Sequence, residues 1–243
     1  MTVKLVTAQR RFTGDLFGNQ IGSKEVVDAL AKVMTAHVLD RDELAFGYKR
    51  RGQVFFLVSG CIREERTLGH TRLWKAGTMF GRWASARSSF ASSGWALADT
   101  TGLSANSTDI YNLAMEHGEV CQALARMDAF RMNTLDGVYC ASRQSPLGRV
   151  ARLLIYLSED AGRGYQTRSV DGRRVVKFVP GGIVDGPSQG DLADALALGR
   201  ATVEKALATL REDGILARPT GKRTNRFYEI LDRDRLDNIA RGV

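Results

Sequence analysis

Apolar residues recur in two different patterns along the chain. Between about residues 38 and 110 they form short runs separated by glycine, such as 53–59 and 61–66 on either side of Gly60. Runs of this kind are typical of short strands joined by tight turns, and they predict a β-sandwich or barrel. A helical stretch with Ser23 as its N-cap precedes them. We therefore expect one domain at residues 23–118, with residues 1–22, which lack clear periodicity, as a mobile N-terminal arm.

The spacing of apolar residues lengthens to that of a helix over residues 119–143. One face of this helix is expected to carry five apolar residues, Val120, Leu124, Met127, Leu135 and Val138. Such a face is buried either against its own domain or against the same helix of a second copy. Periodicity does not separate these alternatives, because the heptad register is irregular at Arg131. We take pairing with a second copy as the working hypothesis.

A second domain is expected at residues 145–243. Ser145 followed by Pro146 is typical of a helix start, because serine caps the free amide groups and proline fits the first helical position. Residues 165–179 predict a β-hairpin with its turn at Asp171 and Gly172. The second domain should therefore begin with a helix and a hairpin.

The segment that follows has the pattern of two short helices. Ser188 and Asp191 form a capping box for a helix over residues 189–196. A tight turn at 197–199 leads to a second helix over 200–212, and Gly214 is a suitable stop. The inward residues of the second helix are expected to be Val203, Ala206, Leu207 and Leu210. Cap, buried positions and stop agree with one another, and together they predict a helix-turn-helix.

Basic side chains follow these helices on a segment whose pattern predicts a two-stranded wing. Arg218, Lys222, Arg223 and Arg226 lie within nine residues that contain no acidic side chain. The whole chain has a formal net charge of +8 and a pI near 9.7, which favours a polyanionic partner. We therefore expect this domain to bind double-stranded DNA.

The second helix is expected to enter the major groove. Candidates for contacts with base edges are its outward residues Arg200, Ala201, Glu204 and Lys205. Arginine and lysine only donate hydrogen bonds and so suit guanine, whereas Glu204 can accept one from cytosine. Candidates for phosphate contacts are Ser188, Gly199, Thr202, Arg218, Lys222, Arg223 and Arg226.

Other classes of protein find little support in the sequence. Cys61, Cys121 and Cys140 are odd in number and lack a CxxC spacing, so neither a disulfide framework nor a metal site is expected. None of the motifs GxxxxGK[ST], HExxH or GxSxG occurs, and the neighbours Glu64 and Glu65 are expected to be solvated on opposite faces of a strand. No apolar run approaches the roughly 20 residues of a membrane span. We expect a cytoplasmic, nucleoid-associated protein without enzymatic activity.

Three stretches give the chain a resemblance to the Crp/Fnr family of bacterial transcription regulators. They are residues 55–60 with 76–81, residues 145–151, and residues 191–193 with 200–203. The resemblance implies an α+β architecture, with a β-roll like that of cyclic-nucleotide-binding domains at 23–118, a dimerisation helix at 119–143 and a winged helix-turn-helix at 145–243. It also implies a homodimer on double-stranded DNA and, for an activator, a contact with RNA polymerase.

The sensor part departs from the cyclic-nucleotide-binding members of this family. Those members carry a Phe-Gly-Glu turn whose carboxylate receives the ribose hydroxyl, but the turn here reads Phe80-Gly81-Arg82. Arginine has no acceptor lone pair, so Arg82 cannot replace the carboxylate. In those members an arginine followed by Ser or Thr holds the cyclic phosphate. Arg87 lies too early in the sequence for a secure match to that arginine. Gly81, Arg82 and Arg87 mark a candidate effector pocket, for which we expect neither cyclic AMP, haem nor a metal, and whose effector the sequence does not identify.

A replication initiator built from two winged helices is the alternative within DNA binding. It would share the basic charge and the C-terminal motif, but its first half should be helical with a second wing. The glycine-separated short runs favour the regulator. Within the resemblance, Ala201 and Lys205 stand where the family often has Glu and Arg, so the family's usual DNA half-site is not expected.

Overall fold

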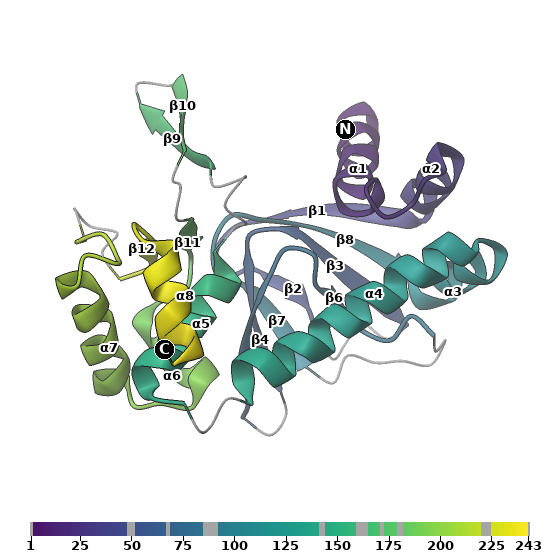
Figure 1. The fold of residues 1–243 in the computed structure, drawn as a ribbon. Helices are drawn as coiled ribbons and strands as arrows, with labels where there is room; N and C mark the ends of the chain where they lie inside the picture. Colours follow the sequence, from purple (N-terminus) through teal and green to yellow (C-terminus); the bar gives the residue numbers. More distant parts are fainter. Residues whose placement is uncertain are drawn as a thin grey trace. The chain divides into compact units, whose positions relative to one another are not determined.

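The computed structural model describes residues 2–47, 52–66, 69–84, 92–140, 144–158, 165–170, 173–178, 182–219 and 225–242. The chain divides into two compact units, which are shown as ribbons in Figure 1. The first unit consists of Met1–His70 and Trp74–Thr134, and the second of Thr71–Leu73 and Leu135–Val243. The first unit combines two sheets with four helices, and the described part of the second unit is mainly helical, in agreement with the predicted α+β class.

The first unit combines short strands with helices before and after them. The strands are β1 (Met34–Leu39), β2 (Leu44–Phe46), β3 (Gln53–Ser59), β4 (Cys61–Arg66), β5 (Thr71–Lys75), β6 (Met79–Phe80), β7 (Ser92–Ala96) and β8 (Thr100–Asn106). The helices are α1 (Thr2–Phe17), α2 (Lys24–Val33), α3 (Ser107–Glu116) and α4 (Gly118–Thr134). Ser23 caps α2 as predicted, because its hydroxyl accepts from the Val26 amide at 3.4 Å.

The strands form two four-stranded sheets, in the orders β1-β8-β3-β6 and β2-β7-β4-β5. Gly60 makes the tight connection between β3 and β4 with a φ of 91°. A Cβ at this position would come within 2.4 Å of the Thr100 hydroxyl oxygen, so no other residue fits without a shift. The predicted glycine-punctuated strands and their packing as two sheets are therefore confirmed.

Aromatic rings fill the space between the two sheets. Phe46 of β2 lies 4.4 Å from Phe80 of β6 and 5.8 Å from Phe55 of β3, measured between ring centroids. Trp74 of β5 meets Phe80 edge to face at 6.1 Å. All four side chains are almost fully buried. Because aromatic side chains bury large apolar areas, this cluster joins the sheets and forms one half of the core.

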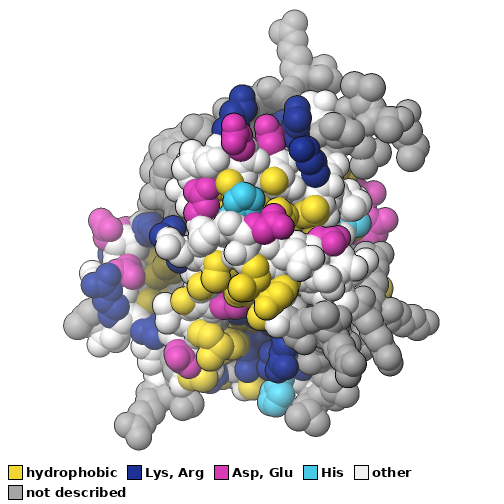
Figure 2. Space-filling model, turned by 90° about the vertical axis from the view of Figure 1, so that its right-hand side faces the viewer, with side chains coloured by type: hydrophobic (Ala, Val, Ile, Leu, Met, Phe, Trp, Pro, Cys, Tyr) yellow, Lys and Arg dark blue, Asp and Glu magenta, His cyan; other side chains and the backbone are white. Residues whose placement is uncertain are grey.

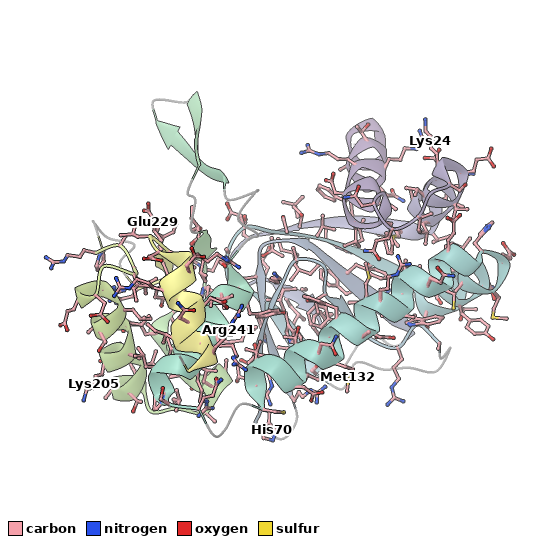
Figure 3. The ribbon with its side chains drawn as sticks, viewed as in Figure 1. Lys24, His70, Met132, Lys205, Glu229 and Arg241 are labelled. Carbon is pink, nitrogen blue, oxygen red and sulfur yellow. The ribbon has the colours of Figure 1, made fainter. Side chains whose placement is uncertain are left out.

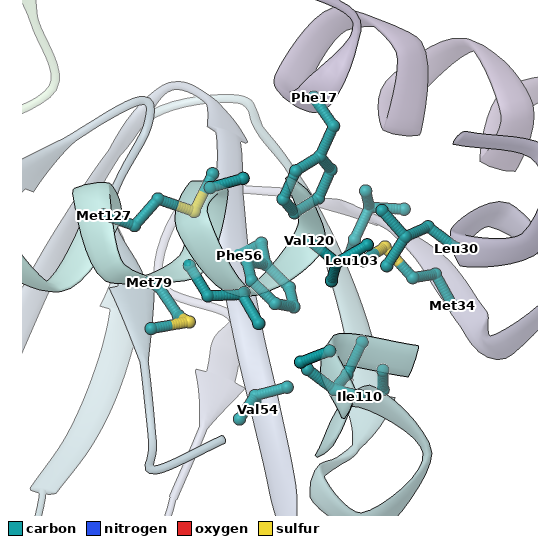
Figure 4. Close-up of a cluster of buried hydrophobic side chains, with 14 of the residues drawn as sticks. Phe17, Leu30, Met34, Val54, Phe56, Met79, Leu103, Ile110, Val120 and Met127 are labelled. Atoms are coloured by element: carbon teal, nitrogen blue, oxygen red, sulfur yellow. The ribbon is translucent and has the colours of Figure 1, made fainter. Parts of the chain in front are cut away.

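The other half of the core lies between the β1-β8-β3-β6 sheet and the helices. Residues alternate along β3, so that Val54 and Phe56 leave the aromatic cluster and face the helices instead. Figure 4 shows them packed with Phe17 of α1, Leu30 of α2 and Val120 of α4. The helices thus cover one face of this sheet, and they are integral to the fold of the unit.

The N-terminal segment is a correction to the sequence-based prediction. Residues 1–22 were expected to form a mobile arm, but Thr2–Phe17 is helical, and Phe17 has 0% exposure. The ring of Phe17 lies 5.6 Å from that of Phe56, edge to face. The glycines of the segment masked the helical pattern, although Phe12 and Leu16 also pack against the core and Thr13 is fully buried.

Helix α4 corrects the predicted dimer surface. Val120, Leu124 and Met127 belong to the core of their own unit, with exposures of 0 to 3%. Side chains without exposed surface in a single chain cannot contact a second copy, so these three are not seam residues. The core interpretation, which periodicity left open, is correct for them. Leu135 and Val138 lie beyond α4 in a short π-helix, η1 (Leu135–Tyr139), where Val138 is buried as well.

Helix α3 carries exposed apolar side chains. Tyr111 is 41% exposed and Met115 is 69% exposed. Figure 2 looks onto the side of the molecule where α3 lies and shows apolar side chains gathered in the middle of that face. The four-residue spacing of Tyr111 and Met115 places them on the same side of the helix, so they form a small apolar patch rather than scattered single residues.

The second unit contains the predicted helices and two elements that were not predicted. Its elements are η1 (Leu135–Tyr139), α5 (Pro146–Leu157), β9 (Tyr165–Val170), β10 (Arg173–Phe178), β11 (Ile183–Asp185), α6 (Gln189–Leu196), α7 (Arg200–Glu212), β12 (Phe227–Glu229) and α8 (Arg233–Arg241). Ser145 caps α5 as predicted, with its hydroxyl 3.1 Å from the Gly148 amide. The unpredicted elements are β11 and α8.

The second unit contains a hairpin of neighbouring strands and a contact between helices that are far apart in the sequence. β9 and β10 form the predicted antiparallel hairpin, with Val170 opposite Arg173, while Asp171 and Gly172 lie outside the described residues. Helix α8 packs on α5, where Gln144 and Arg152 both donate to the Ala240 carbonyl. Leu236 and Ala240 are buried in this contact. The C-terminal helix therefore closes the core of the unit.

Two further findings bear on the alternatives. The described part of the first unit is built on two sheets, so it lacks the helical first half that the two-winged-helix initiator requires. Among the described helices, we find none with the length and apolar character needed to cross a bilayer.

The packing of α1 gives a prediction about stability. Phe17→Ala should lower the free energy of unfolding by about 3 to 5 kcal/mol, because it removes a buried ring and leaves a cavity next to Phe56. Denaturant titration of the full chain measures this difference. Val38→Ala is the control, since Val38 is 73% exposed and its truncation should change the stability by no more than about 0.5 kcal/mol. Equal effects of the two variants would contradict the packed helix.

Candidate nucleic-acid interface

Helix α6 begins at a complete capping box. The Ser188 hydroxyl accepts from the Asp191 amide at 3.1 Å, and Asp191 Oδ2 accepts from the Ser188 amide at 2.7 Å. Both bonds satisfy amide groups that a helix start leaves without partners. The predicted capping box is therefore confirmed, and it fixes where the first helix of the pair starts.

The turn between α6 and α7 is tight and partly strained. Ala197 ends α6 in the left-handed region with a φ of 49°, a conformation that costs a non-glycine residue about 1 to 2 kcal/mol. Arg149 of α5 donates to the Leu196 carbonyl at the end of α6. This bond ties the turn to α5, so the angle between the two helices is supported from a third element.

Helix α7 has a fully buried inner side. Val203, Leu207 and Leu210 each have 0% exposure, and Ala206 has 5%. Leu192, Ala195 and Leu196 of α6 are buried with them. The inward positions predicted for α7 are therefore correct. Their burial prevents α7 from rotating about its axis without exposing apolar surface.

The outer side of α7 presents the side chains predicted to meet base edges. Arg200, Ala201, Glu204 and Lys205 are all exposed. Arg200 Nε donates to Glu204 Oε1 at 2.9 Å, one helical turn away. Figure 3 shows Lys205 pointing away from α7 into solvent. An ion pair this exposed adds little stability, but it holds the Arg200 guanidinium at the start of the helix.

The wing is a small sheet that includes an unpredicted strand. β12 pairs with β11, with Tyr228 opposite Val184, and a single bridge joins Leu216 to Ile230. Tyr228 is almost fully buried, and its burial raises the pKa of its hydroxyl well above the ordinary value. A hydroxyl that stays protonated can keep donating, here to the Asn225 carbonyl at 3.2 Å. Tyr228 thus anchors the wing to the body of the unit.

Arg226 is engaged within the protein. Its NH1 donates to the Gly186 carbonyl at 3.2 Å and lies 3.8 Å from Asp191 Oδ2, the same carboxylate that caps α6. Its side chain is 39% exposed. The predicted phosphate ligand therefore also links the wing to the start of α6, and only part of its guanidinium faces solvent.

The other predicted phosphate ligands differ in how available they are. Ser188 uses its hydroxyl in the capping box, whereas Gly199 is exposed at the start of α7. Thr202 is half-buried and Arg218 is exposed. Lys222 and Arg223 lie outside the described residues. Gly199 and Arg218 are therefore accessible to a phosphate, and Thr202 is partly so.

The candidate effector pocket is held against α4. Gly81 follows β6 with a φ of 91°, and Arg82 is exposed beyond it, while Arg87 lies outside the described residues. Trp83 Nε1 donates to Asp128 Oδ2 of α4 at 3.0 Å. The turn after β6 is therefore connected to α4 of the same unit.

Two arginines with structural roles were missed by the sequence analysis. Arg149 supports the helix-turn-helix turn, and Arg131 contacts the first unit's sheets through the buried carboxylate of Glu64. The expectation that Glu64 is solvated is wrong, since its exposure is 1%. The signal for Arg131 was visible as the break in the apolar face of α4, but the sequence did not show its partner.

A comparison with protein-family models matches residues 148–239 to the Crp-like helix-turn-helix domain. The match spans α5, both helices of the pair, the wing and most of α8. A comparison with curated proteins returned no match.

Solved structures with the same fold cover nearly the whole chain. FixK2 from Bradyrhizobium japonicum is 22% identical with a TM-score of 0.62, over 85% of this chain and 97% of that one. A putative cyclic nucleotide binding protein from Ruegeria pomeroyi is 18% identical with a TM-score of 0.61, over 97% and 98%. TTHB099, a transcriptional regulator of the CRP family from Thermus thermophilus, is 22% identical with a TM-score of 0.59, over 84% and 96%.

The family model identifies the DNA-binding domain, and the shared fold extends the similarity to the sheets of the first unit. Residues 148–239 belong to the Crp-like helix-turn-helix domain family, and the chain as a whole shares its fold with solved regulators of the CRP/FNR family.

Proposed function

We propose that the protein binds a specific DNA sequence as a homodimer and reads it with the outer side of α7. The observation that carries this proposal is the two-sided character of α7, whose inner side is buried while Arg200, Ala201, Glu204 and Lys205 are exposed together. A helix fixed in this way presents its polar side at a defined angle, as insertion into the major groove requires.

Arg200 is the principal reader in this proposal. Its Nε is held by Glu204, which leaves the two terminal nitrogens of the guanidinium to donate together to O6 and N7 of a guanine. Lys205 reaches a neighbouring base edge. The methyl side chain of Ala201 neither donates nor accepts a hydrogen bond, so at its position the specificity comes from apolar contact, and the preferred half-site differs from that of regulators with a glutamate there.

Phosphate contacts come from the groups that flank α7. The amide end of α7 at Gly199 attracts a phosphate through the helix dipole, and the Thr202 hydroxyl adds a donor one turn further on. Arg218 and the basic wing residues Lys222 and Arg223 neutralise the neighbouring backbone. These contacts supply affinity for any sequence, whereas the contacts of Arg200 and Lys205 select one.

Two half-sites require two copies of α7, and the exposed side of α4 supports a way to bring them together. Gln122, Ala125, Ala129 and Met132 are exposed and follow one another at spacings of three, four and three residues. This is the spacing of a coiled-coil seam, and the two alanines allow close approach of a second helix. Met132 is 58% exposed, so a second helix on this face would bury an apolar side chain that solvent now reaches.

The seam gives a prediction about assembly. Ala129→Arg should convert the dimer into a folded monomer, because it inserts a charge where the two helices would touch. Sedimentation velocity at micromolar concentration measures the change. Asn112→Arg is the matched control, since Asn112 is exposed on α3, and it should leave the dimer intact. A wild-type monomer, or a dimer that tolerates Ala129→Arg, would contradict this seam.

Loss of a base contact and loss of a phosphate contact should have different effects on DNA binding. Arg200→Ala should cost about 1 to 3 kcal/mol on the operator and relax the preference at one base pair. Arg218→Ala should weaken all sequences alike and lower the magnitude of the salt slope by about 0.9 for each phosphate that is no longer neutralised. Titrations on operator and scrambled DNA at several salt concentrations measure both effects.

The reverse pattern would show that the wrong element has been assigned to the groove. In that case Arg200→Ala would leave the ratio of specific to non-specific binding unchanged, and Arg218→Ala would abolish it.

Cyclic AMP should not change DNA binding. The Phe80-Gly81-Arg82 turn offers a cation where a ribose hydroxyl needs an acceptor. Calorimetry should therefore detect no binding of cyclic AMP to the wild type, and DNA titrations should be the same with and without it. Arg82→Glu is the variant to compare, because it restores the acceptor. A micromolar dissociation constant for the wild type would show that another residue takes over this role.

A further inference from the structure

The first unit contains a buried carboxylate that needs a cation. Glu64 of β4 is 1% exposed, and it accepts from Trp74 Nε1 at 2.8 Å and from the Ser92 hydroxyl at 2.6 Å. Neutral donors alone compensate only part of the loss of hydration that a buried carboxylate suffers. The site is therefore incomplete without a positive group.

Arg131 of α4 supplies this group through a two-point contact. Its NH2 lies 2.8 Å from Glu64 Oε1 and 3.0 Å from Oε2, and its NH1 donates to the Met79 carbonyl at 3.2 Å. Its side chain is 16% exposed. Arg66 also approaches Glu64 Oε1, at 3.8 Å, but its side chain is 46% exposed, so it lies at the rim of the site.

Two aromatic rings complete the surroundings of the guanidinium. The central carbon of Arg131 lies 4.9 Å from the ring centroid of Trp74 and 5.2 Å from that of Phe80. A carboxylate, a carbonyl and two aromatic rings that stand at 88° to each other together surround a flat cation that donates several hydrogen bonds. This is the chemistry of a guanidinium, and a lysine ammonium could not make the same set of contacts.

The contact also fixes the position of α4. Arg131 occupies the same helix face as Met127, where a fourth apolar residue would continue the buried stripe. Asp128, the neighbour of Met127, accepts from Trp83 at 3.0 Å. The guanidinium and this second bond hold α4 to β6 and the turn after it, and they determine which side of α4 faces outward.

We propose that Arg131 acts as a built-in ligand of the first unit, and that the Glu64, Trp74 and Phe80 side chains form a guanidinium site that it fills. Arg131 is a positioning residue that fixes the rotation of α4. As a result, Ala125, Ala129 and Met132 face a second copy even when no effector is bound. The inference rests on the proposed function for the dimer and for its link to DNA binding, whereas the guanidinium site can be tested by itself through tryptophan fluorescence.

Chemical rescue tests the site. Arg131→Ala should weaken the dimer at least about tenfold and shift the fluorescence of the buried Trp74, because the site loses its cation. Guanidinium chloride at millimolar concentration should restore the dimer and the spectrum with a saturable dependence, and sodium chloride at the same concentration should not. Arg10→Ala, which removes an exposed arginine of the same unit, should neither weaken the dimer nor respond to guanidinium.

A second variant keeps the test decisive if Arg131→Ala does not fold. Glu64→Gln combined with Arg131→Met removes both charges at similar volume, so it should fold and should still form a weakened dimer that does not respond to guanidinium. An undiminished dimer in either variant, or a weakened Arg131→Ala dimer that guanidinium does not restore, would overturn the proposal.

The outcome can be separated from the fate of the proposed function. The dimer and fluorescence measurements need no DNA, so they remain informative if the wild type selects no DNA sequence. If the wild type does bind specifically, its affinity should be full in protein refolded from denaturant and freed of small molecules. A requirement for cell extract in that experiment would overturn the effector-independent part of the proposal.

Discussion

The rest of the structure depends on helix α4, which has one side buried in its own unit and one side exposed to solvent. One side is buried in its own unit through Val120, Leu124 and Met127, and the stripe ends on the buried ion pair between Arg131 and Glu64. A helix held by both apolar packing and a two-point charged contact has little freedom to rotate. Its other side is therefore left as a defined surface, on which we base the proposed dimer.

The helix-turn-helix is constrained in a similar way, by groups that are not themselves expected to touch DNA. Arg149 supports the turn, Asp191 caps α6 and also faces Arg226 of the wing, and α8 covers α5. These contacts connect every element around α7, so the side chains on its outer side are carried by a rigid frame. Such pre-organisation reduces the conformational entropy that binding would otherwise cost.

Local signals predicted the helix-turn-helix well, because its capping box and its buried positions depend on residues close together in the sequence. Partners far apart were not predictable: Glu64 and Arg131 are 67 residues apart, and neither reveals the other. For the same reason the apolar face of α4 was correctly found, but it was assigned to contact with a second copy, whereas it packs within its own unit. Helix α1 was not predicted because Gly14 interrupts its pattern, although Phe12, Leu16 and Phe17 all pack on the core.

The central claim is that a two-fold dimer reads DNA with α7. Selection of bound fragments from random double-stranded DNA by the purified protein tests it most directly, with sequencing of the enriched pool. The account predicts an inverted repeat whose half-sites are centred about one helical turn apart, roughly 10 base pairs, with a guanine in each half-site that Arg200→Ala no longer selects. A pool without enrichment, or a single half-site without its inverted copy, would contradict it.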